Sequence, residues 1–230
     1  MLTKLSLRAL LLGGLLMACN ASWAAPAIGN SQAADGLKAL LVQGSELAVN
    51  QLGRDGGFNQ NATWRIALPK AMQKPAKLMR NLGQGALIDE LENNLNSAAE
   101  QAVPHAKELL LTSIRQMSLQ DASQILSSHP TAATEYLERN SRDELRQRFL
   151  PIVQKTTAGS PLIQQYNQLA SQAGGLGLSK KQPVSAEDYV ADQALNALFG
   201  VLGEQEAELR ANPAKAAGSL LKGVLQAFGK

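Results

Sequence analysis

Leucine and alanine recur at helical spacing along most of this 230-residue chain, and no long run alternates between apolar and polar residues. Apolar residues at positions i, i+3, i+4 and i+7 form one face of an α-helix, which packs on a core. The clearest case runs from Gly36 to a terminating Gly53. The pattern predicts an all-α fold: a single compact bundle of about eight helices over residues 36–228.

Capping residues and prolines divide the pattern into separate helices, because both are typical of helix starts. Pro104 removes an amide donor within residues 86–117, so this segment is predicted to be one kinked helix or two. Ser141 and Glu144 have the spacing of a capping box, which predicts a new helix there. After the first helix, the predicted starts are Pro69, Ala86, Ser118, His129, Ser141, Ser160, Ser185 and Asn212.

Residues 54–68 are the one segment without a helical pattern. Arg54-Asp-Gly-Gly-Phe58 is typical of a turn, and Leu68 precedes a proline, which favours extended backbone. An irregular connection of this length is unusual in a compact domain. Such loops are usually functional or packed by their own side chains.

The first 24 residues have the composition of an export signal. Lys4 and Arg8 precede a ten-residue apolar stretch, which is too short to span a bilayer, and Ser22-Trp-Ala24 supplies small residues for cleavage. We expect cleavage after Ala24, export to the periplasm and a flexible tether over residues 25–35. The rest of the chain has no apolar run long enough for a transmembrane helix.

Leu16-Met-Ala-Cys19 offers an alternative fate for the same leader, because it resembles a bacterial lipobox. In that case Cys19 becomes the lipidated first residue, and the protein is an outer-membrane lipoprotein rather than a free periplasmic one. Cleavage after Ala24 instead removes the only cysteine of the chain. The mature protein then has no disulfide, thiolate metal ligand or cysteine nucleophile.

The charge balance excludes one class of partner. The chain has 22 basic and 19 acidic residues, and removal of Lys4 and Arg8 with the leader leaves 20 against 19. A nearly neutral chain without a basic block gives no electrostatic basis for nucleic-acid binding. We therefore expect no nucleic-acid partner.

Several motifs in the central part of the chain together resemble a known family. These motifs are Asn96-Ser-Ala-Ala-Glu100-Gln-Ala-Val, Met117-Ser-Leu-Gln-Asp121-Ala, Ala132-Ala-Thr134-Glu-Tyr136 and Phe149-Leu-Pro151-Ile-Val. The chain is similar, over nearly all of residues 36–228, to a bacterial family described as domain of unknown function 4197. The resemblance implies a secreted or periplasmic α-helical protein and supplies no activity. Ser97 departs from the basic residue usual in that family.

Asn96 and Glu100 are the first candidate site residues. They lie one turn apart on one helix face among alanines, where a carboxylate is costly to bury without a partner. One interpretation is a polar pocket in which Glu100 acts as an acid, a base or a ligand anchor. The interpretation we favour is a structural network that satisfies backbone groups at neighbouring helix ends.

Asp121, Thr134 and Tyr136 are the other candidates for a ligand site or polar network. Capping alone explains Asp121, three residues after Ser118. Thr134 is expected to bond back to a helical carbonyl, and Tyr136 to pack its ring and place its hydroxyl on a partner. For all three residues we favour a structural role over catalysis.

The remaining patterns indicate no catalytic, cofactor or metal site. His105 and His129 do not form an i, i+4 pair, and no carboxylate cluster has the spacing of metal ligands. No serine stands in a Gly-x-Ser-x-Gly elbow, and the glycine pairs follow predicted helices rather than strands. We expect no cofactor and no resident metal.

The last predicted helix combines Lys215 and Lys222 with Leu221 and Leu225. Such a helix can make a peripheral membrane contact or dock a partner. We favour a closing core helix whose lysines suit its C-terminal dipole.

Two functional hypotheses remain. The first is a non-enzymatic periplasmic module that binds an envelope protein or a small apolar ligand between helices. The second is a hydrolase or lyase that uses Glu100 with Asp121, His105 or Tyr136 beside it. The second requires Glu100 to lie in a cleft with at least one of these groups within hydrogen-bond reach, whereas the first needs only a groove or cavity.

Overall fold

The computed structural model describes residues 29–175 and 184–228. Within these residues the chain forms nine α-helices and two 3-10 turns, without a β-strand, which confirms the predicted all-α class. The α-helices are α1 (Asn30–Leu52), α2 (Lys70–Asn81), α3 (Gly85–Ala102), α4 (Ala106–Gln116), α5 (Leu119–Leu126), α6 (Ala132–Thr157), α7 (Pro161–Gly175), α8 (Ala186–Ala211) and α9 (Ser219–Phe228). The 3-10 turns are η1 (Val103–His105) and η2 (Pro213–Lys215). The predicted export signal and Cys19 lie outside the described residues.

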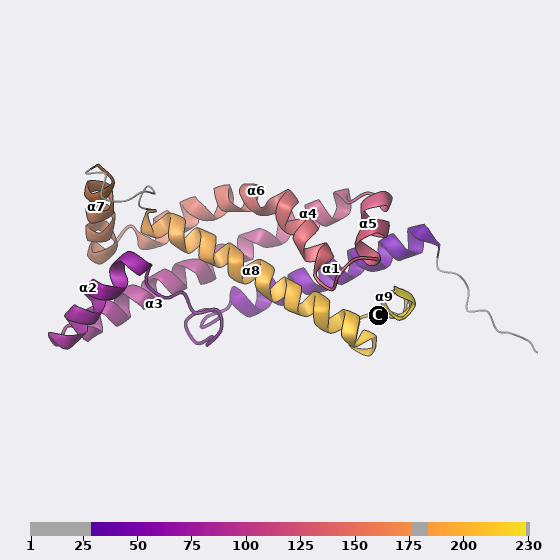
Figure 1. Cartoon of the computed structure of the whole chain (residues 1–230), viewed down its shortest axis with the longest axis horizontal. Coiled ribbons are helices and arrows are strands. Elements are labelled where there is room, and N and C mark those ends of the chain that lie inside the picture. Colours follow the sequence, from indigo (N-terminus) through magenta and orange to yellow (C-terminus); the bar gives the residue numbers. More distant parts are fainter. Residues whose placement is uncertain (1–28, 176–183, 229–230) are drawn as a thin grey trace, which may run out of the picture.

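Helix α8 is the central element of the bundle. It packs against α1, α3 and α6, and α1 also contacts α4, α5 and α9. The arrangement is elongated, with α2, α7 and the start of α3 at one end and α5 and α9 at the other (Figure 1). Helix α2 packs on α3, at the edge of the bundle rather than inside it.

Leucine and alanine fill most of the core, as their helical spacing indicates. Small residues let the helices approach closely. Gly36 of α1 faces Val224 of α9, where an added Cβ would lie 2.5 Å from a Val224 methyl group. A larger residue at position 36 would therefore separate these two helices.

Helix α1 begins at Asn30, six residues before the predicted start. Ala33 and Ala34 are buried in the core, so residues 30–35 belong to the helix and not to the predicted flexible tether. Two alanines among four polar residues in this short segment gave no clear amphipathic pattern. Their burial against neighbouring elements is a tertiary effect that local composition does not show.

Ser141 does not begin a new helix, so this part of the prediction was wrong. Helix α6 continues from Ala132 to Thr157, and Ser141 is buried within it. Its hydroxyl donates a hydrogen bond to the carbonyl of Leu137 at 2.6 Å. A serine that bonds back to the preceding turn needs no N-cap role, although it matches the capping pattern.

Pro104 lies in η1, which joins α3 to α4, so residues 86–117 form two helices, one of the two predicted alternatives. Other segments differ from the pattern in detail. The helix predicted from Asn212 is interrupted after η2 and resumes at Ser219. Leu78, Leu82 and Leu87, which follow helical spacing, are exposed by 61%, 70% and 42% rather than buried in the core.

Candidate functional site

The irregular segment between α1 and α2, residues 53–69, is held against α3, and we call it the anchored loop. Glu100 accepts hydrogen bonds on Oε1 from the backbone amides of Phe58 and Asn59, both at 2.9 Å. Asn96 accepts from the amide of Ile66 at 2.7 Å and donates to its carbonyl at 2.9 Å. The two candidate residues therefore satisfy backbone groups, but those of a loop rather than of helix ends.

Apolar side chains complete the attachment of the anchored loop. Phe58, Ile66 and Leu68 are buried in the core. Trp64 lies over Gly200 of α8, where an added Cβ would come within 2.1 Å of the indole ring. Tyr189 of α8 donates a hydrogen bond to the carbonyl of Ala67 at 3.0 Å. The loop is thus packed by its own side chains, one of the two outcomes expected for its length.

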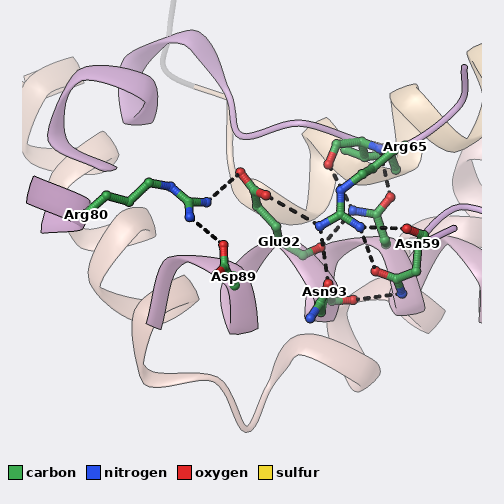
Figure 2. Close-up of polar contacts among 8 residues, drawn as sticks. Asn59, Arg65, Arg80, Asp89, Glu92 and Asn93 are labelled. Carbon is green, nitrogen blue, oxygen red and sulfur yellow. Dashed lines mark hydrogen bonds and ion pairs between the residues drawn. The ribbon is translucent and has the colours of Figure 1, made fainter. Parts of the chain in front are cut away.

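A polar network extends from the loop to the start of α3 (Figure 2). Arg65 donates to the carbonyl of Asn59 at 2.8 Å and lies 3.5 Å from Glu92 Oε2. Arg80 of α2 reaches the other Glu92 oxygen at 3.6 Å and also pairs with Asp89. Glu92 therefore links α2, α3 and the loop through two arginines. None of these residues was a candidate from the sequence, because a lone loop arginine has no characteristic spacing.

A surface hollow of about 940 Å³ lies where the anchored loop meets α3, η1 and α6. Pro104, Pro151 and Ile152 form an apolar wall. Gly53 also lines the hollow. The remaining lining residues are polar or carry charges of either sign: Asp55, Ser97, Glu100, Gln101, His105, Lys155 and Thr156. This larger hollow contains the candidate Glu100, which is 7% exposed.

A smaller hollow of about 550 Å³ lies between α5 and α6 and contains Asp121 and Tyr136. Asp121 accepts from the Ser118 hydroxyl at 2.6 Å and from the Tyr136 hydroxyl at 3.2 Å. The Ser118 hydroxyl, followed by that of Tyr136, lowers the pKa of Asp121 below its ordinary value. Burial, followed by the bond to Asp121, raises the pKa of Tyr136. The predicted cap at Ser118 and the predicted hydroxyl partner of Tyr136 are both present.

Thr134 belongs to a third cluster, which the sequence analysis missed. Its hydroxyl and its backbone amide both donate to Glu206 Oε2 at 2.8 Å, instead of the predicted bond to a helical carbonyl. Glu206 also accepts from the amide of Ala133 at 3.1 Å and from Arg210 Nε at 3.0 Å. The i, i+4 spacing of Glu206 and Arg210 on α8 is the signal that could have indicated this pair.

The structure brings one of the three candidate partners of Glu100, His105, into the same hollow, and among the described residues no hydrogen bond joins Glu100 to any of the three. Glu100 and His105 line the larger hollow, whereas Asp121 and Tyr136 line the smaller one. Among the described residues, no cluster of three histidines, cysteines or carboxylates is arranged to hold a metal ion. No helix in the same part of the chain is long and apolar enough to cross a membrane.

Comparison with known proteins identifies the family. A family model described as a protein of unknown function, DUF4197, matches residues 27–226. The chain belongs to this family. No curated protein and no solved structure shows a match. The description of the family names no activity and no ligand.

Proposed function

We propose that this DUF4197 member is an exported, non-enzymatic binding module whose ligand occupies the larger hollow. The observation that carries the proposal is the way the hollow is built. One wall is the start of the anchored loop, and Glu100, which binds that loop, lies in the lining. A volume of about 940 Å³ lies within the range of small-molecule sites.

The wall formed by the loop is preorganised. Glu100 and Asn96 make four hydrogen bonds to its backbone, and the loop places Phe58 and Ile66 in the core. A wall that is already ordered loses little conformational entropy when a ligand binds. If the loop were not already ordered, ordering it would weaken ligand binding. Its existing order therefore supports a binding role.

The lining indicates the chemistry of the ligand. Pro104, Pro151 and Ile152 suit an apolar body, whereas Lys155 and Asp55 suit polar or charged groups. The ligand we propose therefore carries both, as a polar segment of an envelope protein or an amphipathic small molecule does. The part played by Glu100 supports binding over hydrolysis, because one of its oxygens already accepts two loop amides.

The two histidines of the chain provide a direct test, because each hollow contains one. We expect native mass spectrometry of the protein from envelope extracts to show a retained mass. His105→Ala and Lys155→Ala should lower the fraction of protein that carries this added mass. His129→Ala, in the smaller hollow, should leave that fraction unchanged. When the released ligand is added back to ligand-free protein with isotope-labelled histidines, only the NMR signal of the His105 imidazole should shift. A ligand that instead shifts His129, or a protein that retains nothing, would contradict the proposal.

The proposed compartment can be tested independently by the intact mass of the protein recovered from cells. Cleavage after Ala24 gives a chain that begins at Ala25. Lipidation gives a chain that begins at Cys19 and carries acyl groups. An uncleaved chain in the cytoplasm would contradict export altogether, whereas either processed form supports it.

A further inference from the structure

Basic residues are concentrated in one stretch of this otherwise balanced chain. Residues 56–88 contain no aspartate or glutamate. The same stretch contains five basic residues: Arg65, Lys70, Lys74, Lys77 and Arg80. Four of these five lie on α2, the helix at the edge of the bundle. This local excess is hidden in the overall charge balance, because acidic residues elsewhere offset it.

Among the described residues, two of the five cations have carboxylate partners and three have none. Arg65 and Arg80 pair with carboxylates of α3. In the described part of the chain, no ion pair involves Lys70, Lys74 or Lys77. All three lysines are exposed. Their charge is therefore available to an external anionic partner.

Exposed leucines continue the row of lysines along α2. Lys70, Lys74, Leu78 and Leu82 follow one another at intervals of four residues, which places them along one side of a helix. Leu78 and Leu82 are 61% and 70% exposed, and they are the two most exposed large apolar residues in the described chain. The opposite side of α2 faces the protein through Ala76, which is buried, and through Met72 and Met79, which are partly buried.

We propose that the surface formed by Lys70, Lys74, Lys77 and Leu78 of α2 together with its C-cap residue Leu82, called the α2 face, docks onto an anionic phospholipid membrane surface. A helix that lies in the membrane interface buries leucines at the acyl boundary while lysines reach the headgroups. The combination on one side of α2 fits this geometry. An acidic protein would pair with the lysines but would give no reason for two leucines of this exposure. Helix α2 lies at one end of the elongated bundle (Figure 1).

The test is flotation of the protein recovered from cells with two kinds of vesicle. One contains phosphatidylglycerol and phosphatidylethanolamine, and the other contains phosphatidylcholine alone. We expect stronger partitioning onto the anionic vesicles, and a decline as salt screens the lysines. The readout is the ratio of the two partition coefficients, so a lipid anchor at Cys19 does not decide the result. Equal partitioning onto both kinds of vesicle would overturn the proposal.

Paired variants separate charge from apolar contact. Lys74→Ala with Lys77→Ala should lower the ratio roughly 25-fold, because each basic residue near such a surface contributes about a fivefold change. Alanine is a better helix former than lysine, so this variant should retain α2. Leu78→Ser with Leu82→Ser should lower partitioning onto both kinds of vesicle without a change in charge. If only the lysine pair mattered, the proposed leucine insertion would be wrong, and an acidic protein would be the better partner.

A matched control lies on α9, the other helix with exposed basic and apolar residues. Leu220 is 45% exposed and Lys222 is exposed. We expect Leu220→Ser with Lys222→Ala to leave the ratio unchanged. Loss of binding in this variant, with the α2 variants unaffected, would assign the membrane contact to α9 and overturn the proposal. None of the three pairs of variants touches the larger hollow, so this test is independent of the proposed ligand site.

Discussion

Two buried glutamates bind backbone amides in this protein, in two regions with different surroundings. Glu100 accepts from the consecutive amides of Phe58 and Asn59 and holds the anchored loop. Glu206 accepts from the consecutive amides of Ala133 and Thr134 and occupies the N-terminus of α6, where Thr131 makes no side-chain cap. In both places a carboxylate satisfies amides that have no partner in their own segment.

The two carboxylates differ in the additional groups that compensate their negative charge. Glu206 is fully buried, and it also bonds to the Thr134 hydroxyl and pairs with Arg210. Glu100 is 7% exposed at a surface hollow, and no described ion pair involves it. A fully compensated buried carboxylate is typical of structure alone. A carboxylate that keeps contact with a hollow can also report on, or respond to, a ligand.

The largest expected effect is on Glu206. Glu206→Ala removes the partner of a nearly buried arginine and uncaps α6, so we expect a loss of about 3 to 5 kcal/mol in the free energy of unfolding. Urea denaturation measures this loss. Glu208→Ala is the matched control, because Glu208 lies on the same helix in an exposed pair with Lys215, and its loss should be far smaller than that of Glu206→Ala. Similar losses for the two variants would mean that burial does not distinguish them.

Glu100→Ala should have the next largest effect, about 2 to 3 kcal/mol, because two amides lose their acceptor. Hydrogen exchange should show where this occurs. The amides of Phe58 and Asn59 should lose protection while those of α8 keep it, because the loop detaches before the bundle unfolds. Glu100→Gln retains an acceptor oxygen and should restore part of the protection. If protection fell evenly across the bundle, the glutamate would support the whole fold and not the loop.

A smaller effect is expected where the loop packs on α8. Gly200→Ala places a methyl group against the Trp64 indole, so the ring must shift, and we expect a loss of about 1 to 2 kcal/mol. Gly223→Ala is the control, because nothing lies within 4 Å of its added Cβ and a helical glycine is replaced. That variant should gain about 0.5 to 1 kcal/mol. The two unfolding curves should therefore move in opposite directions, and a stabilised Gly200→Ala would show that the tryptophan does not fix the loop.

The comparison also shows what the sequence could and could not predict. Helical spacing predicted the fold class, and the turn chemistry after Gly53 predicted the irregular segment, because both are local properties. Asn96 and Glu100 form a polar pair among alanines, and this pattern favoured a structural role for both residues. The backbone groups that they bind lie 30 to 42 residues away in the chain. No local pattern specifies such a distant partner.

The sequence-based predictions were wrong or incomplete where contacts between distant segments outweighed a local sequence pattern. Ser141 matches a capping box, yet its hydroxyl bonds to the preceding turn inside α6. Leu78 and Leu82 follow an amphipathic pattern, yet α2 lies at the edge of the bundle and leaves them exposed. Glu206 was missed because the α6 amides that it caps are 72 and 73 residues away. In each case the position of the residue in the bundle, rather than its local spacing, decided its role.

Asp121 extends the comparison to a carboxylate at the surface, and here the smallest effect is expected. The Ser118 and Tyr136 hydroxyls lower its pKa in the folded protein. The bonded carboxylate therefore contributes stability above the ordinary aspartate pKa, near pH 4, and this contribution disappears as the pH falls through the lowered value. We expect Ser118→Ala to raise the pKa of Asp121 more than Tyr136→Phe does, because the Ser118 hydroxyl is the larger cause. Carboxyl-carbon NMR titration measures both shifts. Equal pKa values in the parent and both variants would show that solvent, rather than the two hydroxyls, sets the state of this exposed carboxylate.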